Sequence, residues 1–78
     1  MREEFRENFR ILGLRIAYFR RLRGMTQEQL AEAIGRSVSF VSQIEANNAA
    51  EVKGVSLETL FLMSRVLQVP VARLFEDN

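Results

Sequence analysis

The 78-residue sequence contains no cysteine and no histidine, and these two absences exclude several classes of protein. Without cysteine there is no disulfide scaffold and no thiolate metal site, and without histidine the usual metal ligand is missing. Cysteine and histidine are also common nucleophilic and general acid–base groups, and no paired carboxylates suggest a catalytic cleft. We therefore expect no metal, no cofactor and no enzymatic activity.

Long apolar segments are also absent. No apolar run approaches the ~20 residues that span a bilayer, and the charged N-terminus, MREEFRENFR, lacks the apolar core of a secretory signal. We expect a cytoplasmic protein with no membrane contact. The composition, 47% hydrophobic and 27% charged, is that of a folded chain. The sequence predicts a single domain over residues 1–78, held together by packing alone.

The net charge is only +1, but the charged residues are unevenly distributed along the chain. Residues 1–24 hold seven Arg and three Glu, a balance of +4, whereas residues 25–78 hold four basic and seven acidic residues, a balance of −3. A basic end suits a polyanionic partner, and a solvated arginine-rich helix gives the same count.

The apolar spacing at the start of the chain predicts a helix. Apolar residues recur at steps of three or four from Phe5 to Leu22. Gly13 is expected to bend or fray this helix, because glycine costs roughly 1 kcal/mol against alanine inside a helix. Residues 1–8 are then an N-terminal extension.

Two short helices are expected next. Thr26, with Gln29 three residues later, predicts a capping box at the start of a helix over about 27–34. Gly35 ends that helix, and Ser37 is expected to cap a third helix that reaches about residue 46.

The rest of the chain predicts two further helices. Residues 47–55 have no helical rhythm, and Ser56 is expected to cap a fourth helix through about residue 67. Pro70 suits the first turn of a short fifth helix that ends near residue 75. Strand-like alternation is absent from the sequence, so the expected fold class is all-α, with five helices.

The segment TQEQLAEAIGRSVSFVSQIE, residues 26–45, resembles the helix-turn-helix of the Cro and phage-repressor family, the XRE or lambda-repressor-like domains. The residues that match this pattern in register are Thr26, Gln27, Leu30, Ala31, Gly35, Val41, Ser42, Ile44 and Glu45. Flanking matches extend the resemblance over about residues 10–75. The loop after Glu45 departs from the family pattern, because it is longer and lacks an early glycine.

The resemblance implies a compact five-helix domain with its helix-turn-helix at the second and third helices. It also implies a sequence-specific regulator of transcription, a repressor or activator that binds double-stranded DNA at an inverted repeat. Small stand-alone relatives of this kind include phage repressors and the controller proteins of restriction–modification systems. No small-molecule ligand is expected, since the sequence shows no second domain to sense one.

Residue roles follow from the register of the match. In this motif the third helix enters the major groove, and its first half reaches the base edges. The candidates for base reading are Ser37, Val38, Ser39, Ser42 and Gln43. The candidates for phosphate contacts are Gln27, Arg36, Lys53, Arg15 and Arg23. The family also places an ion pair between the positions of Arg20 and Glu45, which implies a structural pair.

A homodimer is expected from the fourth helix. At 100° per residue, Leu57, Leu60, Ser64 and Leu67 form an inward stripe, and Leu62 and Val66 fall nearly opposite. A second apolar stripe requires a second cover, either the fifth helix or another subunit. A chain this small has little left to cover it, so another subunit is expected. The candidate interface residues are Leu62, Val66, Phe61, Val71 and Phe75.

The main alternative is a protein-interaction module, for example an antitoxin that holds a toxin and binds DNA only secondarily. The acidic C-terminal half and the apolar fourth helix are compatible with it. DNA binding by the protein alone distinguishes the two functions.

Overall fold

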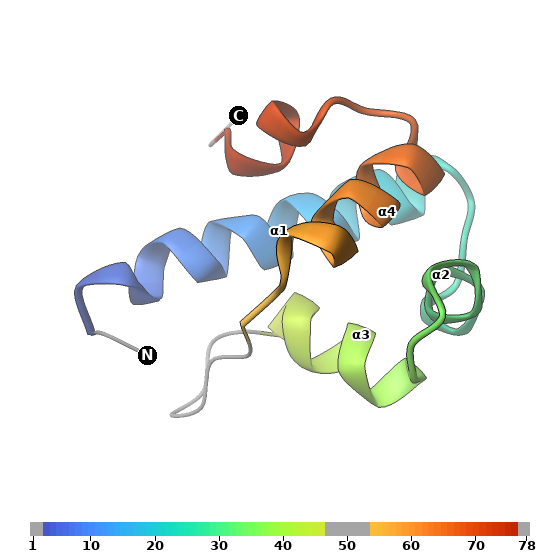
Figure 1. Ribbon diagram of the computed structural model, residues 1–78, viewed down its shortest axis with the longest axis horizontal. Coiled ribbons are helices and arrows are strands. Elements are labelled where there is room, and N and C mark those ends of the chain that lie inside the picture. The colour runs from blue at the N-terminus through green and yellow to red at the C-terminus, as the bar shows by residue number, and fades with distance from the viewer. Residues whose placement is uncertain (1–2, 47–53, 77–78) are drawn as a thin grey trace.

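The computed structural model describes residues 3–46 and 54–76 and is helical throughout that part of the chain (Figure 1). The elements, in order, are the 3₁₀ turn η1 (Glu3–Phe5), the helices α1 (Arg6–Leu22), α2 (Gln27–Ile34), α3 (Val38–Ala46) and α4 (Leu57–Leu67), and the 3₁₀ helix η2 (Val71–Phe75). Neither described range contains a strand, and the all-α prediction is confirmed. The predicted fifth helix is a 3₁₀ helix, and η1 was not expected.

Side-chain caps define the helix starts that the sequence predicted. The Thr26 hydroxyl accepts from the Gln29 amide at 3.1 Å, and the Gln29 side chain accepts from the Thr26 amide at 2.8 Å. This reciprocal pair satisfies two amides that the first turn of α2 leaves open. At the other end, Gly35 has φ +71°, the left-handed conformation that lets the chain leave α2 and begin α3 after two further residues.

The N-terminal extension is shorter than expected. Helix α1 begins at Arg6, so residues 6–8 belong to it. Two exposed ion pairs support this end: Arg6 binds Glu3 at 2.8 Å, and Arg10 binds Glu7 at 2.5 Å. The hydrogen bond from Arg10 lowers the pKa of Glu7 below its usual range. Pairs of this spacing each add roughly 0.2–0.5 kcal/mol to the stability of a helix end.

Gly13 does not interrupt α1, and the expected bend or fraying is wrong. The helix runs unbroken through this position, and Gly13 is buried against α3. A Cβ atom on Gly13 would lie 2.2 Å from the carbonyl oxygen of Ile44. Only glycine allows so short a distance between the two backbones, so Gly13 is the crossing point of α1 and α3.

One apolar cluster joins α1, α2, α3, α4 and η2. Its buried members are Leu12, Ile16, Phe19, Leu30, Ala31, Ile34, Val41, Ile44, Leu60, Met63, Leu67 and Leu74. On α4 the inward arc differs from the expected one. Leu57 is 69% exposed, whereas Thr59 and Met63, which were not assigned inward, are fully buried.

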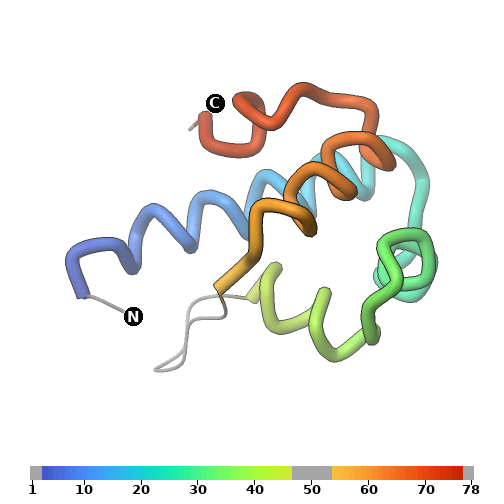
Figure 2. The backbone as a smooth tube through the Cα atoms, viewed as in Figure 1, coloured from blue at the N-terminus to red at the C-terminus, as the bar shows by residue number. Residues whose placement is uncertain are grey.

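Figure 2 shows how these contacts arrange the backbone. Helix α1 is the long central element, with α3 packed against one side of it and η2 against another. Helix α2 packs against both α3 and α4, so it joins the two halves of the core. No helix among the described residues is long and apolar enough to cross a membrane. The outer face of α3 is left uncovered by the other described elements (Figure 1).

Candidate nucleic-acid interface

The outer face of α3, together with the residue that precedes the helix, carries the five residues assigned to base reading. Ser39, Ser42 and Gln43 are exposed, and Val38 is 43% exposed. The fifth, Ser37, is exposed and also caps the helix, because its hydroxyl accepts from the Phe40 amide at 3.1 Å. These side chains form a short polar surface with one apolar member, which suits the edges of base pairs in a major groove.

The C-terminal half of α3 is fixed to α1 by a buried ion pair. Arg20 donates from Nε and Nη2 to the two carboxylate oxygens of Glu45, at 2.6 and 2.9 Å. The two side chains are only 8% and 5% exposed. Arg20 also donates from Nη1 to the Met25 carbonyl at 2.8 Å. The pair has the contact implied by the resemblance, and its fork geometry fixes the orientation of α3.

Gln27 extends this network to α2. Its side-chain Nε2 donates to Glu45 Oε1 at 2.9 Å, so one carboxylate receives hydrogen bonds from α1 and α2 together. Gln27 is the first residue of α2, where amide groups precede the first intrahelical hydrogen bond. It therefore braces α3 from a position that also suits an anion.

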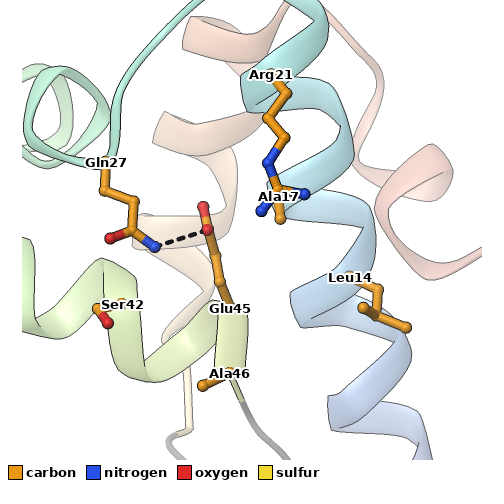
Figure 3. Close-up of a pocket in the computed structure, with 7 residues that line it drawn as sticks. All are labelled: Leu14, Ala17, Arg21, Gln27, Ser42, Glu45 and Ala46. Atoms are coloured by element: carbon orange, nitrogen blue, oxygen red, sulfur yellow. Dashed lines mark hydrogen bonds between the residues drawn. The ribbon is translucent and has the colours of Figure 1, made fainter.

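A cleft of about 250 Å³ lies where α1, the start of α2 and the end of α3 meet (Figure 3). Its lining residues are Leu14, Ala17, Arg21, Gln27, Ser42, Glu45 and Ala46. Arg21 was not among the sequence-based candidates. A signal for it existed, because Gly13, Ala17 and Arg21 follow at steps of four and therefore share one side of α1. The small residues on that side mark the crossing with α3.

Arg36, expected to reach a phosphate or a base, contacts its own chain. Its Nη2 donates to the Thr59 hydroxyl at 3.1 Å, and its guanidinium lies 5.0 Å from the ring centroid of Phe40. Phe40 itself is half-buried and packs against the core. Arg36 thus links the turn between α2 and α3 to the start of α4.

Arg15 and Arg23 lie with the C-terminal elements. Arg23 donates to the carbonyls of Leu67 and Gln68, at 2.7 and 3.3 Å, and so caps the end of α4. Arg15 stacks on the ring of Phe19 at 5.0 Å and donates to the Arg73 carbonyl at 3.5 Å. Both side chains have intrachain partners on the α4 and η2 side of α1. Lys53 lies outside the described residues.

The residues assigned to a dimer interface differ in exposure. Phe61 is 56% and Phe75 is 54% exposed. Leu62, Val66 and Val71 are half-buried, and the first two pack against the core. The stripe of Leu62 and Val66 is therefore partly covered by the chain itself, contrary to the premise that a monomer leaves it bare.

The geometry defines the class of protein. Two short helices, α2 and α3, are joined by a tight glycine turn, and the second presents an open polar face while its far end is clamped to the core. This arrangement is a helix-turn-helix. Among the described residues there is no group of His, Cys, Asp or Glu that could hold a metal ion.

The chain belongs to the helix-turn-helix family, whose model matches residues 16–74. It is 42% identical to a protein of Bacillus subtilis (strain 168) described as the uncharacterized HTH-type transcriptional regulator YazB, over 64% of this chain and 87% of that one. The family is thus one of DNA-binding transcriptional regulators of the XRE type, as predicted, and is not a class of enzymes.

Solved structures show the same architecture. The restriction–modification controller protein C.AhdI of Aeromonas hydrophila matches with a TM-score of 0.78 at 26% identity, over 88% of this chain and 98% of that one. The clp gene regulator ClgR of Corynebacterium glutamicum matches with a TM-score of 0.74 at 32% identity, over 83% of this chain and 65% of that one. The lambda-repressor-like fold is therefore confirmed.

Proposed function

We propose that the protein binds an inverted-repeat operator in double-stranded DNA as a homodimer and regulates transcription there. In each subunit α3 lies in the major groove. The observation that carries the proposal is the contrast between the two ends of α3. Glu45 is held by Arg20 and Gln27, whereas Val38, Ser39 and Gln43 are exposed. A fixed helix with a free polar face is what base reading requires.

Individual roles follow from side-chain chemistry. Gln43 can pair with adenine through two hydrogen bonds, and Val38 can pack on a thymine methyl group. The serines accept or donate to several bases and therefore specify less. Gln27 stands at the start of α2, where its backbone amide suits a phosphate.

The dimer rests on exposed apolar residues of α4 and η2. Leu57 and Phe61 are four residues apart on α4 and are 69% and 56% exposed, and Phe75 of η2 is 54% exposed. Helix α4 and η2 also pack on one another. A short recognition helix reads few base pairs, so a pair of half-sites about 34 Å apart supplies the needed specificity.

A second candidate, a protein-interaction module, is favoured by α1. Leu14, Tyr18 and Leu22 follow at steps of four and are 50%, 51% and 56% exposed. Such a stripe suits a protein partner.

Selection of bound sequences from a random DNA pool by the protein alone tests the first function. The expected result is an inverted repeat, bound with an affinity that falls steeply with salt. If the protein binds no duplex, or binds all sequences equally well, the result contradicts sequence-specific regulation and favours the protein-interaction module.

A further inference from the structure

We propose that Arg21 holds a phosphate of the DNA backbone in the cleft between α1, α2 and α3. This inference rests on the proposed function and adds to it a contact made by the first helix, outside the helix-turn-helix itself. The cleft is lined by Arg21 and Ala17 of α1, by Gln27 of α2 and by Ser42 of α3.

The position of Arg21 follows from the crossing of α1 and α3. Gly13 lies against the α3 backbone, Ala17 is buried one turn later, and Arg21 follows one turn beyond. The two small residues bring α3 close, and the long side chain of Arg21 then reaches into the cleft beside Ala17 (Figure 3). Arg21 therefore lines the same cleft as Ser42 of α3, the helix whose outer face also carries Gln43.

The charge on Arg21 is uncompensated in the described part of the chain. Arg20 is paired with Glu45, and Arg36 is bound to Thr59. Arg23 is bound to the carbonyls that end α4. The Arg21 side chain, in contrast, is exposed and forms no hydrogen bond or ion pair with any residue of 3–46 or 54–76. The free N–H groups of the Arg21 guanidinium can donate to phosphate oxygens, and the group lies near the helix that we propose reads the DNA.

The other groups of the cleft suit an anion. The amides of Gln27 and Glu28 come before Leu30, whose amide makes the first intrahelical bond of α2 to Thr26 at 3.0 Å. They are therefore open to donate to a phosphate. The hydroxyl of Ser42 is a further donor. The Glu45 carboxylate would repel an anion, but Arg20 and Gln27 together donate three hydrogen bonds to it.

The salt dependence of DNA binding tests this contact. The probe is a mixed-sequence duplex of about 20 base pairs, and each lost phosphate contact lowers the slope of log affinity against log salt by about 0.9. We expect Arg21→Gln to reduce this slope by about 0.9 per bound subunit and to weaken binding roughly threefold to tenfold at low salt. Arg21→Lys should keep the slope, because it keeps the charge.

Arg65→Gln is the matched control, because it removes one exposed arginine on α4. It should leave the slope near that of the unmodified protein. Arg21→Gln should also weaken the selected operator and the mixed-sequence duplex by the same factor, since a phosphate carries no sequence information. The thermal unfolding midpoint should not change, because the Arg21 side chain has no hydrogen-bond or ion-pair partner among the described residues.

Two outcomes would overturn the assignment. One is an equal slope for Arg21→Gln and Arg65→Gln, and the other is a loss confined to the selected operator, which would make Arg21 a base contact. In both cases the unmodified protein still binds its operator, and the proposed function stands. If the unmodified protein binds neither duplex at any salt concentration, the proposed function fails and the Arg21 contact fails with it.

Discussion

Gly13 of α1 and Ile44 of α3 touch backbone to backbone, at a separation that leaves no room for a Cβ atom. We expect Gly13→Ala to destabilise the protein, although helix propensity alone would predict a gain in stability. Alanine would favour an isolated helix by roughly 1 kcal/mol. Here the methyl group must push α3 away, and we expect a net loss of about 2 kcal/mol in the free energy of unfolding.

Gly54→Ala is the matched control for this variant. Among the described residues, no atom other than those of Gly54 itself and its chain neighbours lies within 4 Å of the Cβ position at Gly54. Its free energy of unfolding should change by less than about 0.5 kcal/mol. Chemical denaturation measures both variants, and a stabilised Gly13→Ala protein would contradict the close crossing.

The Arg20–Glu45 pair predicts a combined loss of stability and DNA affinity. Arg20→Ala leaves the Glu45 carboxylate buried without its main partner, which costs about 3–5 kcal/mol. Arg10→Ala removes an arginine from an exposed pair with Glu7 and should cost less than about 0.5 kcal/mol. Thermal unfolding and a DNA shift assay on both variants provide the comparison. Equal effects would mean that the buried pair does not position α3.

Gln43 should affect specificity and leave the fold intact. It is exposed on α3, so Gln43→Ala should retain the circular dichroism spectrum and thermal midpoint of the unmodified protein. Loss of a base contact should weaken operator binding by about 1–3 kcal/mol. Binding to mixed-sequence DNA is the internal control and should not change. An equal loss of affinity for both duplexes would mean that Gln43 contacts the DNA backbone and not a base.

Phe61 provides the test of the dimer. Phe61→Glu should give a helical monomer with greatly weakened operator binding, because paired carboxylates at a symmetric contact repel and are poorly solvated. Leu22→Glu is matched to it, since Leu22 and Phe61 are both 56% exposed. Sedimentation of the three proteins measures the effect. A monomeric unmodified protein at concentrations that saturate the operator would refute the dimer, as would a Phe61→Glu dimer.

Local signals in the sequence predicted most of the fold. The start and end of α2 were predicted correctly, because the capping box of Thr26 and Gln29 and the left-handed Gly35 depend only on residues close in the sequence. The short η2 was expected only as a helix, since five residues after a proline are too few to distinguish 3₁₀ from α geometry by pattern.

The errors have a common physical cause, which is contact between residues distant in the chain. Gly13 resembles a helix breaker until α3 packs against it. Leu57 has the right spacing for the core, but the arc of α4 that turns inward contains Thr59 and Met63. The fold also gives Arg23 contacts that the sequence does not show, because the carbonyls that it caps, at the end of α4, come close only after folding; its phosphate contact stays a prediction. Arg21 lines a cleft that forms only when α1, α2 and α3 pack together.

Helix α3 is held at its start by the Ser37 cap, near its end by the Glu45 ion pair, and along its buried side by the core. The side chains of Val38, Ser39 and Gln43 are exposed and form no hydrogen bond to other described residues, so their replacement should leave the fold intact. New operators would then be acquired through substitutions at three surface positions. A library randomised at these positions should keep its folded fraction high while its preferred DNA sequences diverge.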